Sequence, residues 1–138
     1  MIFNSEQELS DFAERLGKSL KPPLVFELIG DVGAGKTTFT RALAKGLGIK
    51  TPVTSPTFSI SNRYYSKEKS LELIHYDFYR LSDPGLMSFE LSEALADKNA
   101  IIVIEWGDFI KDLLPKNHPT VSFKIISDTT RELTLSNL

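Results

Sequence analysis

The chain has 138 residues, of which 25% are charged, with a formal net charge of −2 and no cysteine. The length predicts one domain, residues 1–138, and is short for a nucleotide enzyme that carries its own substrate-binding lid. The near-neutral charge disfavours direct, tight RNA binding, and the lack of cysteine excludes disulfides and thiolate metal sites. Because the sequence shows neither a signal peptide nor a long apolar run, we expect a cytoplasmic protein that does not contact a membrane.

The first predicted elements are a helix over about residues 5–20 and a strand. Ser5 and Glu8 have the spacing of a capping box, and apolar residues then recur at helical intervals. Two consecutive prolines end this helix. The short apolar run Leu24 to Ile29 predicts a buried parallel strand that leads into the next segment.

The segment Gly30 to Thr37 reads G-x-x-x-x-G-K-[ST] and lies between that strand and a helical pattern that runs from Lys36 to Gly48. This context predicts a phosphate-binding loop, because glycines let backbone N–H groups approach phosphates and the following helix N-terminus favours negative charge. Lys36 would contact the β- and γ-phosphates, and Thr37 would bind Mg²⁺. The alternative is a glycine-rich turn with a solvated lysine.

The next stretch, Thr51 to Phe58, predicts an oxygen-rich loop. It contains two prolines and four hydroxyl residues, which exclude a helix and favour an extended backbone. The hydroxyl groups of Thr54, Ser55 and Thr57 could sense a γ-phosphate in the way that a switch segment does.

The remaining chain alternates strands and helices. We expect a hairpin formed by 58–65 and 71–79, a helix capped by Ser82 or Asp83, a central strand from Ala100 to Ile104, a short helix from Phe109 to Leu114, and a terminal hairpin within 121–135. Together these elements predict an α/β fold. It would be a P-loop NTPase-like three-layer sandwich, with a mainly parallel central sheet and antiparallel hairpin additions.

Two carboxylates are candidates for the chemistry of a bound nucleotide. Glu105 directly follows the aliphatic central strand, so we expect it to hold Mg²⁺, directly or through water. Asp77 interrupts an aromatic run, where a charge is costly unless it is paired or functional. It could act on Mg²⁺ or on an attacking water, or it could instead pair with Arg80 or Tyr79.

Two neighbouring residues have more ordinary interpretations. His75 is a lone histidine, and we expect it to serve packing or a surface hydrogen bond rather than catalysis. Trp106 is the only tryptophan, and by itself it is more typical of a core or an interface than of a base-stacking platform.

Four motifs, Gly30 to Thr38, Thr54 to Phe58, His75 to Arg80 and Ile104 to Trp106, follow one another at compatible spacing. With them the chain resembles the TsaE family, formerly YjeE, over nearly its whole length. The resemblance implies a small bacterial P-loop ATPase that is required to make threonylcarbamoyladenosine in tRNA. It would work with the carbamoyltransferase TsaD and its inactive paralogue TsaB, reach tRNA only through that complex, and be monomeric alone.

The resemblance also implies roles for single residues. Thr37 and Glu105 would hold Mg²⁺, Thr54 to Thr57 would form the switch, and Asp77 would support hydrolysis together with Glu105 and Lys36. The residues that would bind ATP are Gly33, Ala34, Gly35, Lys36, Thr37, Thr38, Glu6 and Arg131, of which the last two would border the adenine pocket. In the helix after Arg80 the chain departs from the family, with Glu90 where glycine is usual and Ala94 where an aromatic residue is common, so a partner contact there could differ in detail.

Other classes of protein share the phosphate loop. A small-molecule kinase would need an arginine-bearing lid, whereas the arginines of this chain are scattered. A GTPase would need N-K-x-D and D-x-x-G patterns, and neither occurs in the sequence. A non-catalytic, nucleotide-gated binding module is the third possibility, and it differs from the favoured ATPase only in whether turnover matters.

Overall fold

The computed structural model describes residues 1–54, 61–79 and 85–138. In chain order its elements are β1 (Ile2–Phe3), α1 (Glu6–Ser19), β2 (Leu24–Ile29), α2 (Lys36–Gly46), β3 (Ser61–Ser66), β4 (Leu71–Asp77), α3 (Gly85–Leu95), β5 (Ala100–Glu105), the 3₁₀ helix η1 (Gly107–Leu113), β6 (Thr120–Ile125) and β7 (Arg131–Ser136).

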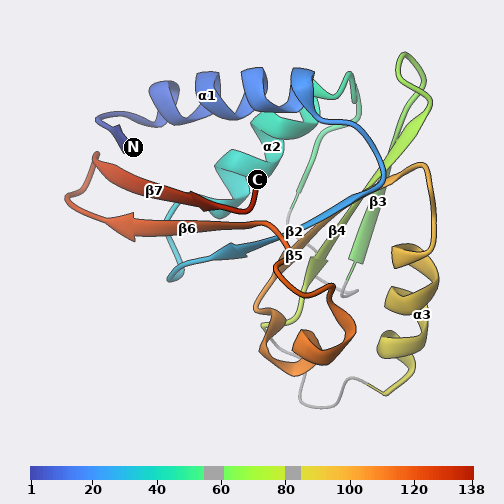
Figure 1. The fold of residues 1–138 in the computed structure, drawn as a ribbon. Helices are drawn as coiled ribbons and strands as arrows, with labels where there is room; N and C mark the ends of the chain where they lie inside the picture. Colours follow the sequence, from blue (N-terminus) through green and yellow to red (C-terminus); the bar gives the residue numbers. More distant parts are fainter. Residues whose placement is uncertain (55–60, 80–84) are drawn as a thin grey trace.

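The strands form one seven-stranded sheet in the order β1-β7-β6-β2-β5-β4-β3 (Figure 1). Its centre is parallel, since β2 pairs with both β5 and β6 and β5 also pairs with β4 in that sense. The outer pairs β3–β4, β6–β7 and β1–β7 are antiparallel. The structure therefore confirms the predicted α/β fold with a parallel centre and hairpin additions.

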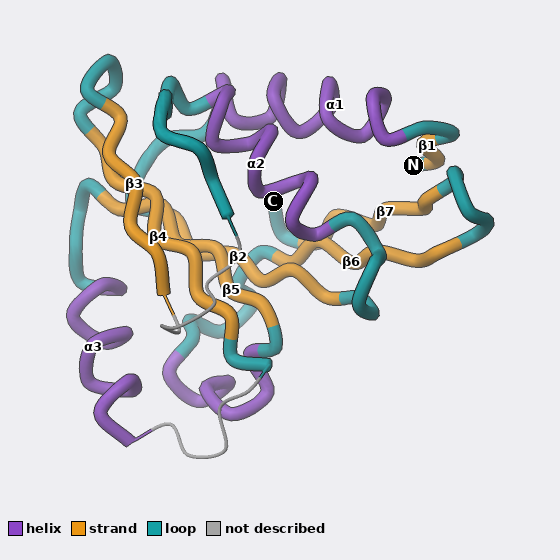
Figure 2. The backbone as a smooth tube through the Cα atoms, turned by 180° about the vertical axis from the view of Figure 1, so that it is seen from behind, coloured by secondary structure: helices purple, strands orange, loops and turns teal. Residues whose placement is uncertain are grey.

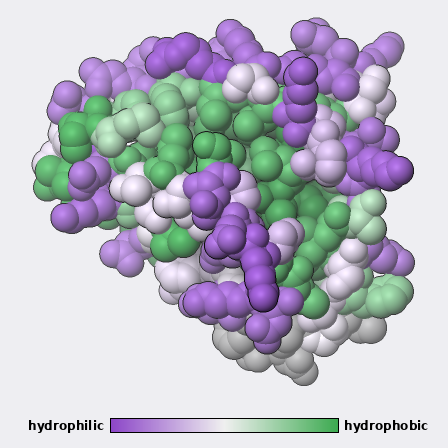
Figure 3. All heavy atoms as spheres, in the orientation of Figure 1, coloured by the Kyte–Doolittle hydropathy of each residue, from purple (hydrophilic) through white to green (hydrophobic). Residues whose placement is uncertain are grey.

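Helices cover both faces of the sheet and make three layers. Figures 1 and 2 show α1 and α2 on one face, with α3 on the other. The first face carries an apolar cluster that joins the sheet to Leu9, Phe39 and Leu43, and the second carries a cluster that includes Leu91 and Ile110. Figure 3 shows hydrophilic residues along the rim formed by α1 and apolar residues beneath it. In the described ranges, no helix is both long and apolar enough to span a membrane.

Local signals account for the boundaries of the N-terminal helices. The Ser5 side chain caps α1 by accepting the N–H of Glu8 at 3.2 Å, as the capping box predicts. The Glu8 carboxylate, however, accepts the N–H of Asn4 at 2.7 Å rather than that of the cap residue. Helix α2 ends at Gly46, and Gly48 just beyond it has the left-handed φ of 82° that commonly follows a helix.

Some elements differ from the sequence-based expectation. The helical segment expected at 109–114 begins earlier, at Gly107, and is a 3₁₀ helix. Strand β1 was not predicted, because two residues carry no periodic signal and are held in place by pairing with β7. The expected helix caps Ser82 and Asp83, and residues 58–60 of the expected hairpin, lie outside the described residues.

Glycines bring α1 and α2 into close contact. A Cβ atom on Gly17 of α1 would overlap the carbonyl oxygen of Leu43, and one on Gly46 of α2 would overlap the carbonyl oxygen of Glu14. Backbone oxygens cannot move aside as a flexible side chain would. The absence of side chains at these two positions therefore sets the separation of the helices.

The Gly46→Ala variant should be less stable than the parent protein. Helix propensity alone predicts the opposite result, because alanine ordinarily stabilises a helix relative to glycine by up to about 1 kcal/mol. Overpacking costs typically about 1–3 kcal/mol, which should lower the midpoint of thermal or urea unfolding. Arg15→Ala, an exposed position of α1, is the control and should stay within about 0.5 kcal/mol. An unchanged or raised midpoint for Gly46→Ala would contradict the close-contact interpretation.

Candidate nucleotide site

The parallel centre of the sheet brings the carboxyl ends of β2, β4 and β5 to one edge. Asp77 at the end of β4 lies in register with Glu105 at the end of β5, and Leu28 of β2 lies on the other side of Glu105. Side chains two residues apart on a strand share a face. His75 and Asp77 therefore both face α2, whereas Tyr76 between them belongs to the apolar cluster under α3.

The loop after β2 has the backbone that a phosphate cradle requires. Gly33 and Gly35 have left-handed φ angles of 82° and 104°, which side chains rarely adopt. Gly35 is the N-cap of α2 and supplies no side-chain cap, so no side chain at this position covers the first N–H groups of the helix. A Cβ at Gly33 would meet nothing within 4 Å. The loop therefore borders open space, which suits an anion bound at the helix N-terminus.

Lys36 lies where this loop meets the strand ends. The residue is only 7% exposed, and its Nζ donates hydrogen bonds to the carbonyl oxygens of Gly30 and Asp31, the latter at 3.2 Å. Burial lowers the pKa of Lys36 below the usual lysine value, while the negative charges of Glu105, Asp77 and Asp31 act in the opposite direction. The ammonium group thus lies among backbone oxygens and carboxylates, which offset part of the cost of its burial.

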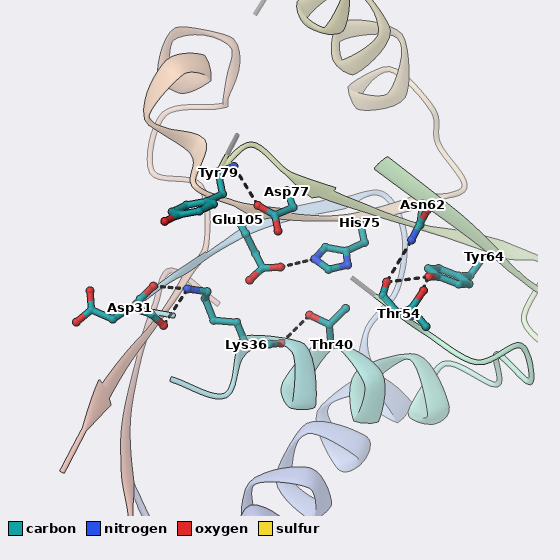
Figure 4. Close-up of polar contacts among 11 residues, drawn as sticks. Asp31, Lys36, Thr40, Thr54, Asn62, Tyr64, His75, Asp77, Tyr79 and Glu105 are labelled. Carbon is teal, nitrogen blue, oxygen red and sulfur yellow. Dashed lines mark hydrogen bonds and ion pairs between the residues drawn. The ribbon is translucent and has the colours of Figure 1, made fainter. Parts of the chain in front are cut away.

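The two acids differ in their surroundings (Figure 4). Glu105 is 4% exposed, and its Oε2 lies 2.5 Å from the Nε2 of His75. Asp77 is half-buried and its Oδ1 accepts the backbone N–H of Tyr79 at 3.0 Å. The expectation for His75 was therefore wrong in part, since its hydrogen bond is buried and is made to a candidate site residue. Arg80, the other suggested partner of Asp77, lies outside the described residues.

Trp106 lies beside the same group of charges. It follows Glu105 with a left-handed φ of 58°, and its ring packs against Tyr79 with centroids 4.8 Å apart. The Nζ of Lys36 is 4.6 Å from the centre of the tryptophan ring. Such a contact is a cation–π interaction. The tryptophan ring thus lies at the edge of the candidate phosphate site, beside Lys36 and Tyr79.

A cavity lies beside the phosphate loop, on the side away from Asp77 and Glu105. A cavity of about 360 Å³ is lined by Glu6 and Leu9 of α1, by the glycines of the loop, by Thr38 and by Arg131. Thr38 donates to Glu6 at 3.3 Å, and Arg131 donates to the carbonyl oxygen of Gly33 at 3.2 Å. The structure thus brings the two expected adenine-pocket residues to one cavity beside the loop.

The expected switch is described only at its first residue. The hydroxyl of Tyr64 on β3 accepts the N–H of Thr54 and donates to its carbonyl oxygen, both at 3.2 Å, and Asn62 donates to the same oxygen. Thr54 is therefore anchored to β3 through its backbone. Ser55 and Thr57 lie outside the described residues.

The residues present fit ATP and Mg²⁺. Thr37 is the second residue of α2, at the helix end that faces the acids. The ammonium group of Lys36 and the backbone N–H groups of a helix N-terminus suit phosphates. Within the described residues, no cluster of three or more acidic, histidine or cysteine side chains could hold a metal by itself. Mg²⁺ usually takes one or two protein ligands and completes its shell with water and phosphate oxygens, which Thr37 and Glu105 would satisfy.

The link between His75 and Glu105 and the contribution of Asp31 were missed in the sequence. The spacing of His75 and Asp77 does place both on one face of a strand. That signal is incomplete, because it does not say that this strand pairs with the one ending in Glu105.

Comparisons with known proteins agree with the geometry. A family model described as "Threonylcarbamoyl adenosine biosynthesis protein TsaE" matches residues 3–133. The chain is 37% identical to the tRNA threonylcarbamoyladenosine biosynthesis protein TsaE of Rickettsia bellii, covering 99% of this chain and 93% of that one. It is 33% identical to the protein of the same name from Treponema pallidum, over 98% of each chain. A crystal structure of Bacillus subtilis YdiB superposes with a TM-score of 0.75 at 31% identity, covering 99% of this chain and 82% of that one.

Proposed function

Because the chain belongs to the TsaE family of tRNA threonylcarbamoyladenosine biosynthesis, we propose that it is a slow, Mg²⁺-dependent ATPase. In this proposal residues 1–138 act as one domain whose turnover resets or activates a TsaB–TsaD complex in the cytoplasm. The observation that carries it is the meeting of Lys36, Asp77 and Glu105 at the first turn of α2.

Binding of ATP rests on the loop and on the cavity beside it. Residues 33–38 offer backbone N–H groups and the Lys36 ammonium to the phosphates. Lys36 would exchange the carbonyl oxygens that it now contacts for phosphate oxygens, which are stronger acceptors because they are charged. Glu6 and Arg131 would border the base in the adjoining cavity.

Hydrolysis rests on the acids at the strand ends. Mg²⁺, when bound, neutralises charge on the β- and γ-phosphates. Thr37 and Glu105 would hold the ion, and Asp77 would orient or deprotonate the attacking water, because its backbone anchor at Tyr79 fixes the carboxylate direction. Thr54, Ser55 and Thr57 would report the γ-phosphate to the partner proteins. In this proposal ATP hydrolysis acts on partner proteins, whereas a small-molecule kinase would transfer phosphate to a substrate of its own.

Lys36→Ala should weaken ATP binding by roughly 100-fold or more, a loss of about 3 kcal/mol. The variant lacks the ammonium group that would exchange the loop carbonyl oxygens for phosphate oxygens of ATP. Calorimetric titration with ATP and Mg²⁺ measures the change. Lys45→Ala, at the exposed far end of the same helix, is the control and should bind like the parent. Equal affinity in the Lys36 variant would contradict phosphate binding by this loop.

Glu105→Ala and Asp77→Ala should keep ATP affinity within about tenfold but lower kcat by about 100-fold or more, since they act on the metal and the water rather than on the phosphates directly. Single-turnover hydrolysis and binding, measured on the same preparations, separate the two effects. Asp108→Ala, an exposed acid nearby, should leave both unchanged. Undiminished hydrolysis by the Glu105 variant would remove the metal assignment.

Addition of TsaB and TsaD from the same organism should raise the ATPase rate by about fivefold or more, because a small, slow ATPase of this kind acts through partners. Phosphate release is measured with each protein alone and with the mixture. The Lys36→Ala variant, mixed with the same partners, gives the background. A lack of stimulation would favour a small-molecule kinase or an unrelated ATPase.

A further inference from the structure

We propose that His75 is a positioning residue that holds the carboxylate of Glu105 toward the first turn of α2. It does so by donating a hydrogen bond from Nε2 to Oε2. The inference rests on the proposed role of Glu105 as the Mg²⁺-holding acid, and it adds a residue for which the sequence predicts only packing or a surface hydrogen bond.

The contact is short and excluded from water. Nε2 and Oε2 are 2.5 Å apart, and the two side chains are 0% and 5% exposed. A carboxylate can only accept a hydrogen bond, so the histidine hydrogen lies on Nε2. A bond to an ionised group in surroundings without water is stronger than one between neutral groups.

The sheet register explains why a histidine can reach this acid. Asp77 lies opposite Glu105 on the neighbouring parallel strand, and His75 is two residues earlier on the same face. The Glu105 side chain extends across the sheet between the His75 ring and Lys36 (Figure 4). Histidine thus contacts the acid from the side away from the phosphate loop, where it does not compete with a ligand.

Glu105 needs such a contact because its side chain is long. A glutamate has several rotatable bonds, so fixing its side chain in one conformation costs conformational entropy. Lys36 attracts the carboxylate without selecting a direction, because an ammonium is a compact charge with rotatable donors. The His75 bond fixes one oxygen, so the other has a defined position.

Packing alone does not account for a histidine at this position. Its second ring nitrogen, Nδ1, is buried and has no hydrogen-bond partner among the described residues. An unsatisfied buried polar atom lowers the stability of the fold, a cost that an apolar side chain of similar size would avoid. The hydrogen bond from Nε2 to Glu105 is therefore what a histidine contributes at this position.

Two substitutions separate hydrogen-bond donation from packing. In His75→Gln the amide nitrogen can occupy the position of Nε2, whereas in His75→Asn it lies near the position of Nδ1 and does not reach Glu105. The measurement is the Mg²⁺ concentration that half-saturates binding of a non-hydrolysable ATP analogue, followed by calorimetry with the full chain. Loss of a group that orients a metal ligand typically costs 10- to 100-fold in metal affinity. We therefore expect an increase of about tenfold or more for His75→Asn and less than about threefold for His75→Gln.

Controls distinguish this inference from the function on which it rests. Binding of ADP without Mg²⁺ should be nearly unchanged in both variants, and Glu105→Ala should raise the Mg²⁺ requirement by itself. The double variant of Glu105→Ala with His75→Asn should be no worse than Glu105→Ala alone. Should the asparagine variant not fold, His75→Leu compared with His75→Gln decides the same question.

Two results overturn the inference alone, while Glu105→Ala still raises the Mg²⁺ requirement. One is parent-like Mg²⁺ dependence of His75→Asn, and the other is a glutamine variant as impaired as the asparagine variant. An unchanged Mg²⁺ requirement in Glu105→Ala instead overturns the metal role of Glu105, and with it the proposed function of that residue.

Discussion

The parallel pairing of β2, β5 and β4 is the constraint on which the site depends. It places two carboxylates in register at one edge of the sheet, beside the loop that leads to Lys36. Two neighbouring acids repel each other, and a buried ammonium is poorly solvated. The acids and the ammonium therefore stabilise each other. Burial lowers the pKa of Lys36, and the negative charges of the acids act to raise it. The carboxylates of Glu105, Asp77 and Asp31 outnumber the single ammonium of Lys36, so a bound metal ion would enter a site with excess negative charge.

Strand β4 separates chemistry from packing by simple alternation. His75 and Asp77 face α2 and the phosphate loop, whereas Tyr76 points into the apolar layer under α3. Burial there raises the pKa of the Tyr76 hydroxyl to about 12, so this tyrosine stays neutral. One strand thus supplies polar groups to one layer and a large ring to the other. A shift of one residue in register would exchange the two sets.

Elements with strong local signals could be predicted from the sequence, and contacts between distant segments could not. The Ser5 cap and the apolar runs of β2 and β5 gave the correct elements, because each signal lies within a few residues. The place of Glu105 at the end of β5 followed from the aliphatic run before it, whereas the register of Asp77 with Glu105 depends on the pairing of β4 with β5. The contact of His75 with Glu105 depends on which strands pair, and β1 exists only through its partner. Neither can be read from periodicity.

The contact between Gly17 and Gly46 has a mechanical meaning for the phosphate site. Helix α2 begins at the phosphate loop and ends at this contact, so the two features lie roughly 15 Å apart on one rigid rod. Because the two backbones pack directly against each other, no side chain can change rotamer there and α2 can move little relative to α1. A small rotation about the glycine end would displace Lys36 relative to the acids on β4 and β5. The contact at Gly46 therefore helps to determine how accurately Lys36, at the N-terminus of α2, is placed against the two acids.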